Sequence, residues 1–106
     1  MSLQADAQNL LVVLQRVLHA LRRFGASYAA KLEDRLQPLV ADFESGVRAH
    51  SRERASATLD DIKPLMRDIS AAATKGEMGI FSDGTLRQYH ELKMIFQESR
   101  YAGETL

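Results

Sequence analysis

The chain has 106 residues, with 14 Lys plus Arg against 14 Asp plus Glu, three His, and neither Cys nor Trp. A chain of this length is expected to form a single domain, over residues 1–106, and can bury a hydrophobic core without covalent cross-links. The lack of cysteine excludes disulfide frameworks and cysteine-based zinc sites. The balanced formal charge excludes the long-range field that draws a whole domain onto nucleic acid or an anionic membrane.

Neither a membrane span nor a secretory signal is predicted. The longest unbroken apolar run, Leu10 to Leu14, has five residues, whereas a span needs about 20. Secretory signals carry positive charge ahead of their apolar segment, but Asp6 is the only charged side chain before this run. We therefore expect a cytoplasmic protein that has no membrane partner.

Residues 3 to 24 carry the clearest pattern in the chain, and it predicts a helix. Its apolar positions alternate at spacings of three and four, and they are Leu3, Ala7, Leu10, Leu14, Val17, Leu21 and Phe24. Further apolar residues widen this face to an arc of about 160°. So wide an arc predicts either two neighbouring helices or one neighbour and a second copy of the chain. The residues available for self-association are Leu11, Val12, Val13 and Leu18.

A second helix is predicted from Ser27, which is a suitable N-cap. Its apolar positions are Tyr28, Leu32, Leu36, Leu39, Val40, Phe43 and Val47. Proline removes a backbone hydrogen bond and clashes with the preceding turn. Pro38 therefore predicts a kinked or broken helix that ends near Gly46, and a single long helix running through Gly25 is the alternative.

A third helix is predicted after Thr58, which forms a capping-box pair with Asp61. Its apolar positions are Ile62, Leu65, Met66, Ile69, Ala72 and Ala73. Because proline is favoured in the first turn of a helix, Pro64 is expected near the start of this element.

Residues 48 to 58 contain no apolar side chain larger than alanine. They predict an exposed connection or the solvated start of the next helix. Arg48, Arg52 and Arg54 lie in this segment, and Arg48 and Arg52 would share a helical face. The three arginines are the candidate for a basic patch that contacts nucleic acid.

Residues 75 to 85 hold three of the six glycines and predict a loop. With Ser82 as N-cap, Phe81 and Leu86 take the positions of a hydrophobic staple, so a last helix is expected from about residue 83 to about residue 101. Its apolar positions are Leu86, Tyr89, Leu92, Ile95 and Phe96. Since no strand pattern competes, the sequence predicts an all-α, single-domain bundle of about four helices, two of them with proline kinks or proline starts.

The residue types and their spacings give no support for an active site or a metal centre. None of His19, His50 and His90 has a His, Asp or Glu at both i+3 and i+4, where a helical metal site would need ligands. There is no Gly-x-Ser-x-Gly motif, and the glycine-rich segment lacks the Lys-Ser/Thr pair of a phosphate-binding loop. We expect no catalytic residue, no metal and no cofactor.

Protein binding is the function that the sequence favours. The loop places three large apolar side chains on a backbone interrupted by glycines, and methionine adapts readily to a partner surface. An acidic residue and the first turns of the last helix follow the loop directly. The predicted partner-binding residues are Met78, Ile80, Phe81, Asp83, Tyr89 and His90.

The same loop carries a family resemblance. Gly76-Glu-Met-Gly-Ile-Phe-Ser-Asp83 resembles the Gly-Gly-Met-Gly-Ser-Phe-Asn-Asp string of a family of small all-helical bacterial proteins, several of them encoded like immunity proteins. Tyr28-Ala-Ala-Lys-Leu32 is similar to a Trp-x-x-x-Leu feature upstream in that family. The chain departs from the pattern at Glu77, Ile80 and Ser82, and has Tyr28 in place of Trp. The resemblance implies a toxin-neutralising or otherwise uncharacterised cytoplasmic binding protein and not a catalyst.

These observations predict a non-catalytic module that binds another protein and forms a homo-oligomer through its first helix. The sharper hypothesis is an immunity-like inhibitor that occludes a toxin or effector. One alternative is a nucleic-acid-associated regulator that uses Arg48, Arg52 and Arg54, and another is a structural homo-oligomeric helical protein.

Overall fold

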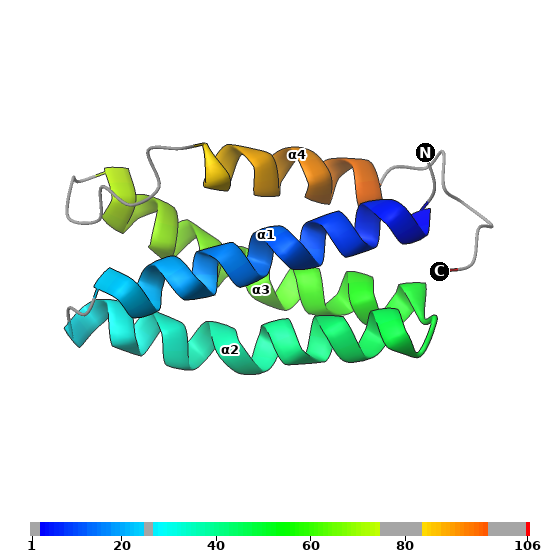
Figure 1. Cartoon of the computed structure of the whole chain (residues 1–106), viewed down its shortest axis with the longest axis horizontal. Helices are drawn as coiled ribbons and strands as arrows, with labels where there is room; N and C mark the ends of the chain where they lie inside the picture. Colours follow the sequence, from blue (N-terminus) through cyan, green and yellow to red (C-terminus); the bar gives the residue numbers. More distant parts are fainter. Residues whose placement is uncertain (1–2, 25–26, 75–83, 98–105) are drawn as a thin grey trace.

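A computed structural model of the chain describes residues 3–24, 27–74, 84–97 and 106, which contain four helices. These are α1 (Leu3–Phe24), α2 (Ser27–Arg48), α3 (Arg52–Thr74) and α4 (Thr85–Gln97). Successive helices run in opposite directions, and the start of α1 and the C-terminus lie at the same end of the bundle (Figure 1). The predicted all-α, four-helix domain is confirmed, and α1 and α2 are separate antiparallel helices.

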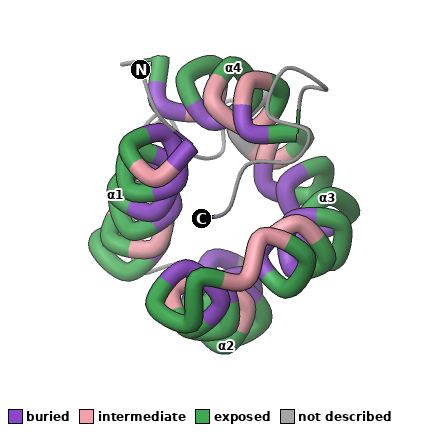
Figure 2. The backbone as a smooth tube through the Cα atoms, turned by 90° about the vertical axis from the view of Figure 1, so that its right-hand side faces the viewer, coloured by how far each residue is buried: buried purple, intermediate pink, exposed green. Residues whose placement is uncertain are grey.

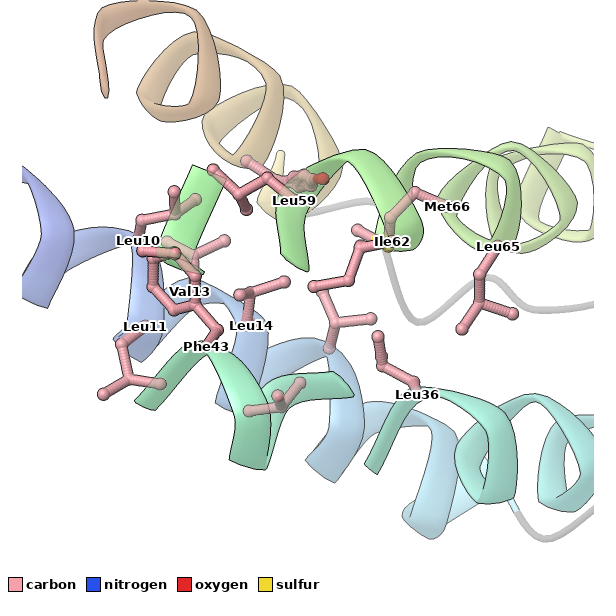
Figure 3. Close-up of a cluster of buried hydrophobic side chains, with 14 of the residues drawn as sticks. Leu10, Leu11, Val13, Leu14, Leu36, Phe43, Leu59, Ile62, Leu65 and Met66 are labelled. Carbon is pink, nitrogen blue, oxygen red and sulfur yellow. The ribbon is translucent and has the colours of Figure 1, made fainter. Parts of the chain in front are cut away.

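The buried faces of all four helices point towards one interior (Figure 2). The periodic positions predicted for α1 are confirmed from Leu3 to Leu21, all of them buried. Side chains of α1, α2 and α3 meet in the middle of the bundle, among them Leu14, Leu36 and Ile62 (Figure 3). Burial of one such side chain contributes about 1.5–3 kcal/mol, so the apolar period alone accounts for the inward faces.

The two prolines lie inside α2 and α3. The helix α2 continues through Pro38 to Arg48, and α3 begins at Arg52, well before Pro64. A break at Pro38 and a helix start at Pro64 are therefore both wrong, and a kink at either proline stays a prediction. Both prolines lie on exposed positions, while the turns around them are anchored by buried side chains such as Leu36. Burial on both sides of each proline offsets the lost hydrogen bond.

The connection between α2 and α3 is much shorter than the predicted segment 48–58, because only residues 49–51 separate the two helices. The amide of Arg54 donates to Ser51 Oγ at 3.2 Å, which makes Ser51 the N-cap of α3. Thr58 lies within α3, where its Oγ1 donates to the carbonyl oxygen of Arg54 at 2.9 Å, so its predicted capping role is wrong.

Small residues explain why that segment folds into the bundle. A Cβ atom added to Gly46 would lie 3.0 Å from the amide nitrogen of Ala55, and Ala55 is fully buried. The backbones of α2 and α3 therefore approach closely at these two residues. Of the two alternatives predicted for 48–58, the start of the next helix is confirmed for residues 52–58. Its solvated side includes Glu53, Arg54 and Ala57, while Ala55 and Thr58 are buried.

Leu106 adds a further buried side chain at the end of the bundle where α1 begins (Figure 1). Its main-chain oxygen accepts a hydrogen bond from His50 Nδ1 at 2.9 Å. His50 follows α2 and adopts a φ of 54°, in the left-handed region that commonly ends a helix. His50 is thus held by a structural contact.

Candidate functional site

The predicted partner-binding residues divide into two groups. Met78, Ile80, Phe81 and Asp83 lie outside the described residues. Tyr89 is 1% exposed, and its burial raises the pKa of its phenol. A partner therefore has no access to Tyr89, and its predicted role in binding is wrong. The next residue, His90, is exposed, with its ring centroid 5.3 Å from that of Tyr89.

The predicted self-association residues are mostly used inside the bundle. Leu11 and Val13 are buried, Leu18 is half-buried against the core, and Val12 alone is largely exposed, at 47%. The physical reason is that α1 packs against both α2 and α4 (Figure 2). The fold therefore supports the first explanation of the wide apolar arc, in which α1 contacts two neighbouring helices.

An ion pair fixes the side of α1 that faces α2. Arg22 Nε and Glu33 Oε1 lie 3.0 Å apart. Leu11 and Leu18 precede Arg22 by three turns and by one, so they lie on the same side. This side of α1 is therefore covered by α2, and self-association stays a prediction.

The three arginines of the alternative basic patch flank the connection between α2 and α3. Arg48 ends α2 and pairs with Glu44 at 3.0 Å. Arg52 and Arg54 open α3, where Arg54 Nη2 donates to Ser45 Oγ at 3.2 Å. The predicted shared face of Arg48 and Arg52 is wrong, because a chain reversal separates them. Pairing with Glu44 also lowers the charge that Arg48 presents to a phosphate.

The outer face of α4 provides an exposed surface that the sequence did not predict. Met94 is 68% exposed, more than any other large apolar side chain among the described residues. It lies one turn after the exposed His90, beside Arg87 and Glu91, which form an ion pair of 3.3 Å. We call these four residues the α4 surface. The only indication of this exposure in the sequence is that Met94 lies outside the apolar period formed by Tyr89, Leu92 and Phe96.

The described part of the chain contains neither a cluster of metal ligands nor a membrane-spanning helix. No group of three or more His, Cys, Asp or Glu side chains there is placed to hold a metal ion. None of the helices described combines the length and apolar character needed to cross a membrane.

The comparisons with known proteins give no family for this chain. No protein-family description, no curated protein and no solved structure matches it.

Proposed function

We propose that this chain is a non-catalytic protein-binding module that uses the α4 surface. The observation that supports it is the 68% exposure of Met94 on a helix whose other large apolar side chains are buried or half-buried. Transfer of such a side chain into an interface contributes about 1.5–3 kcal/mol. Methionine suits this role because its unbranched thioether chain adapts to the partner.

The composition of the α4 surface also fits an interface. Its apolar residue is flanked by His90, which both donates and accepts hydrogen bonds, and by the Arg87–Glu91 pair. An apolar centre with a polar rim is the usual anatomy of a protein interface. Val12, the other exposed large apolar residue among those described, makes a suitable comparison because it lies on α1.

Site-specific photo-crosslinking tests this proposal. A benzophenone amino acid at position 94, and separately at position 12, is introduced into the full chain in its host cells. We expect a defined adduct from position 94 and none from position 12. Affinity for the purified adduct partner should then fall at least tenfold on Met94→Asp and stay unchanged on Val12→Asp. Equal crosslinking from both positions, or an unchanged affinity for Met94→Asp, would contradict the proposal.

We further propose that the partner is a toxin or effector and that binding occludes its working surface in the cytoplasm. This rests on the resemblance carried by residues 76–83, with Met78 and Ile80 as additional contacts. The test compares Met78→Asp and Ile80→Asp with Met94→Asp against the same captured partner. Loss of affinity on Met94→Asp with full retention in both loop variants would restrict binding to α4 and remove the basis for the inhibitor hypothesis.

A further inference from the structure

Two polar contacts identify the edges of α3 that face its neighbours. Arg35 of α2 pairs with Asp68 at 3.2 Å, so the edge of α3 that contains Asp68 faces α2. Asp61 lies two turns before Asp68 and belongs to the same edge. The edge that faces α2 is thus acidic.

A hydrogen bond identifies the edge of α3 that faces α4. Gln97 Nε2 donates to Ser56 Oγ at 3.3 Å. Residues that follow Ser56 by two and three turns lie on the same edge, and these are Lys63 and Arg67. On α4, Lys93 precedes Gln97 by one turn and faces α3. Asp60 follows Ser56 by one turn and lies on this edge too. The boundary between the antiparallel helices α3 and α4 (Figure 1) therefore holds three cations and one acidic side chain, and its charge is net positive.

We call Lys63, Arg67 and Lys93 the cationic seam. Lys63 and Arg67 are exposed and Lys93 is half-buried. None of the three forms an ion pair with another described residue, whereas Arg22, Arg35, Arg48 and Arg87 all do. Lys63 and Arg67 are one helical turn apart, about 5–6 Å, so their charges repel each other. Asp60, three residues before Lys63, offsets part of that repulsion, and opposite charge from outside the chain relieves the rest.

The cationic seam adjoins the α4 surface, since Lys93 immediately precedes Met94 and His90 lies on the turn before. Building on the proposed function, we propose that the partner presents an acidic protein surface, with Asp or Glu side chains around an apolar residue that contacts Met94. A protein fits better than nucleic acid, because nucleic-acid binding draws much of its affinity from cation–phosphate contacts, whereas a protein interface combines an apolar centre such as Met94 with a polar rim. Carboxylates opposite the three cations would orient the partner and speed its association.

Selection from a random 12-residue peptide library displayed on phage tests the chemistry while the partner is still unidentified. The immobilised full-length protein should select peptides that are rich in Asp and Glu and contain apolar residues. Binding of the selected peptides, measured by fluorescence anisotropy, should weaken about tenfold or more in Lys63→Glu/Arg67→Glu/Lys93→Glu. It should also weaken as salt is raised from about 50 to about 300 mM.

A matched variant controls for net charge. Arg16→Glu/Arg23→Glu/Lys31→Glu makes the same change in total charge at exposed positions of α1 and α2, and should bind the peptides with unchanged affinity. Circular dichroism of both triple variants checks that the fold is retained. Equal loss in the two triples would overturn the proposal, because it would show a general charge effect.

Two other outcomes separate this inference from the proposed function. Selected peptides that are neutral or basic, yet are lost on Met94→Asp, would overturn the acidic partner and leave the α4 surface in place. Tight binding of a 20-base-pair DNA duplex that depends on the cationic seam, with no acidic peptide selected, would overturn it in favour of nucleic acid.

Discussion

The pairs α2–α3 and α3–α4 are both antiparallel neighbours, but they are held together differently. At α2–α3 the backbones meet at Gly46 and Ala55. A Cβ atom on Gly46 would fit only if Ala55 moved away from it. At α3–α4 the packing is far less extensive, and the long side chain of Gln97 reaches Ser56. Close packing by small residues brings the charged side chains Arg35 and Asp68 within reach of each other across α2–α3, whereas the cations at the α3–α4 boundary have no such partner among the described residues.

The largest effect is expected where α4 is anchored to the core. Phe96 is fully buried, and its ring meets that of Phe43 edge-on with centroids 6.1 Å apart. Phe96→Ala should lower the free energy of unfolding by about 3–5 kcal/mol, measured by denaturant titration. Met94→Ala on the outer face of the same helix is the control and should change it by less than about 0.5 kcal/mol. A loss below about 1 kcal/mol for Phe96→Ala would mean that α4 is not part of the cooperative core.

A smaller but still clear effect is expected at the close approach of α2 and α3. Gly46→Leu inserts a side chain where only 3.0 Å is available, so α2 and α3 must separate locally. We expect a loss of about 1–3 kcal/mol in the free energy of unfolding. Ala41→Leu, at an exposed position of the same helix, should have almost no effect. Equal effects of the two substitutions would show that the tight contact is absent in solution.

The pH dependence of stability tests the burial of Tyr89 on the α4 side. Burial raises the pKa of its phenol in the folded state, while the unfolded chain ionises near the ordinary value of about 10. The contribution is therefore fully present below about pH 10 and falls above it, by up to about 1.4 kcal/mol per pH unit. Denaturant midpoints between pH 8 and pH 11 should fall less steeply in Tyr89→Phe. Identical slopes for the two proteins would place Tyr89 in contact with water.

The smallest effect is expected from the polar contact between α3 and α4. Gln97→Ala removes the hydrogen bond to Ser56, which lies at the surface. We expect a change within about 0.5 kcal/mol in the free energy of unfolding. If the loss exceeds about 1.5 kcal/mol, the α3–α4 boundary is more rigid than its packing indicates, and the contrast with α2–α3 weakens.

Sequence patterns predicted the helices and their inward faces more accurately than the site. The spacing of Leu10, Leu14 and Val17 identified the buried side of α1, because a helical period is a local property of the chain. Prediction failed for Tyr89, because this residue was expected both to pack in the hydrophobic core and to contact a partner protein. It also failed for Met94, because exposure of an apolar residue leaves no pattern of its own.

The sequence by itself determined that the chain forms four amphipathic helices and that it has no cysteine chemistry. Composition and apolar period do not depend on which helices become neighbours. Only the tertiary structure decided which neighbours use those faces. It assigned the wide arc of α1 to α2 and α4, brought Gly46 against Ala55, and set Lys63 on the same boundary as Lys93. The physical reason is that helix separation and register depend on side chains distant in sequence, which meet only when the bundle closes.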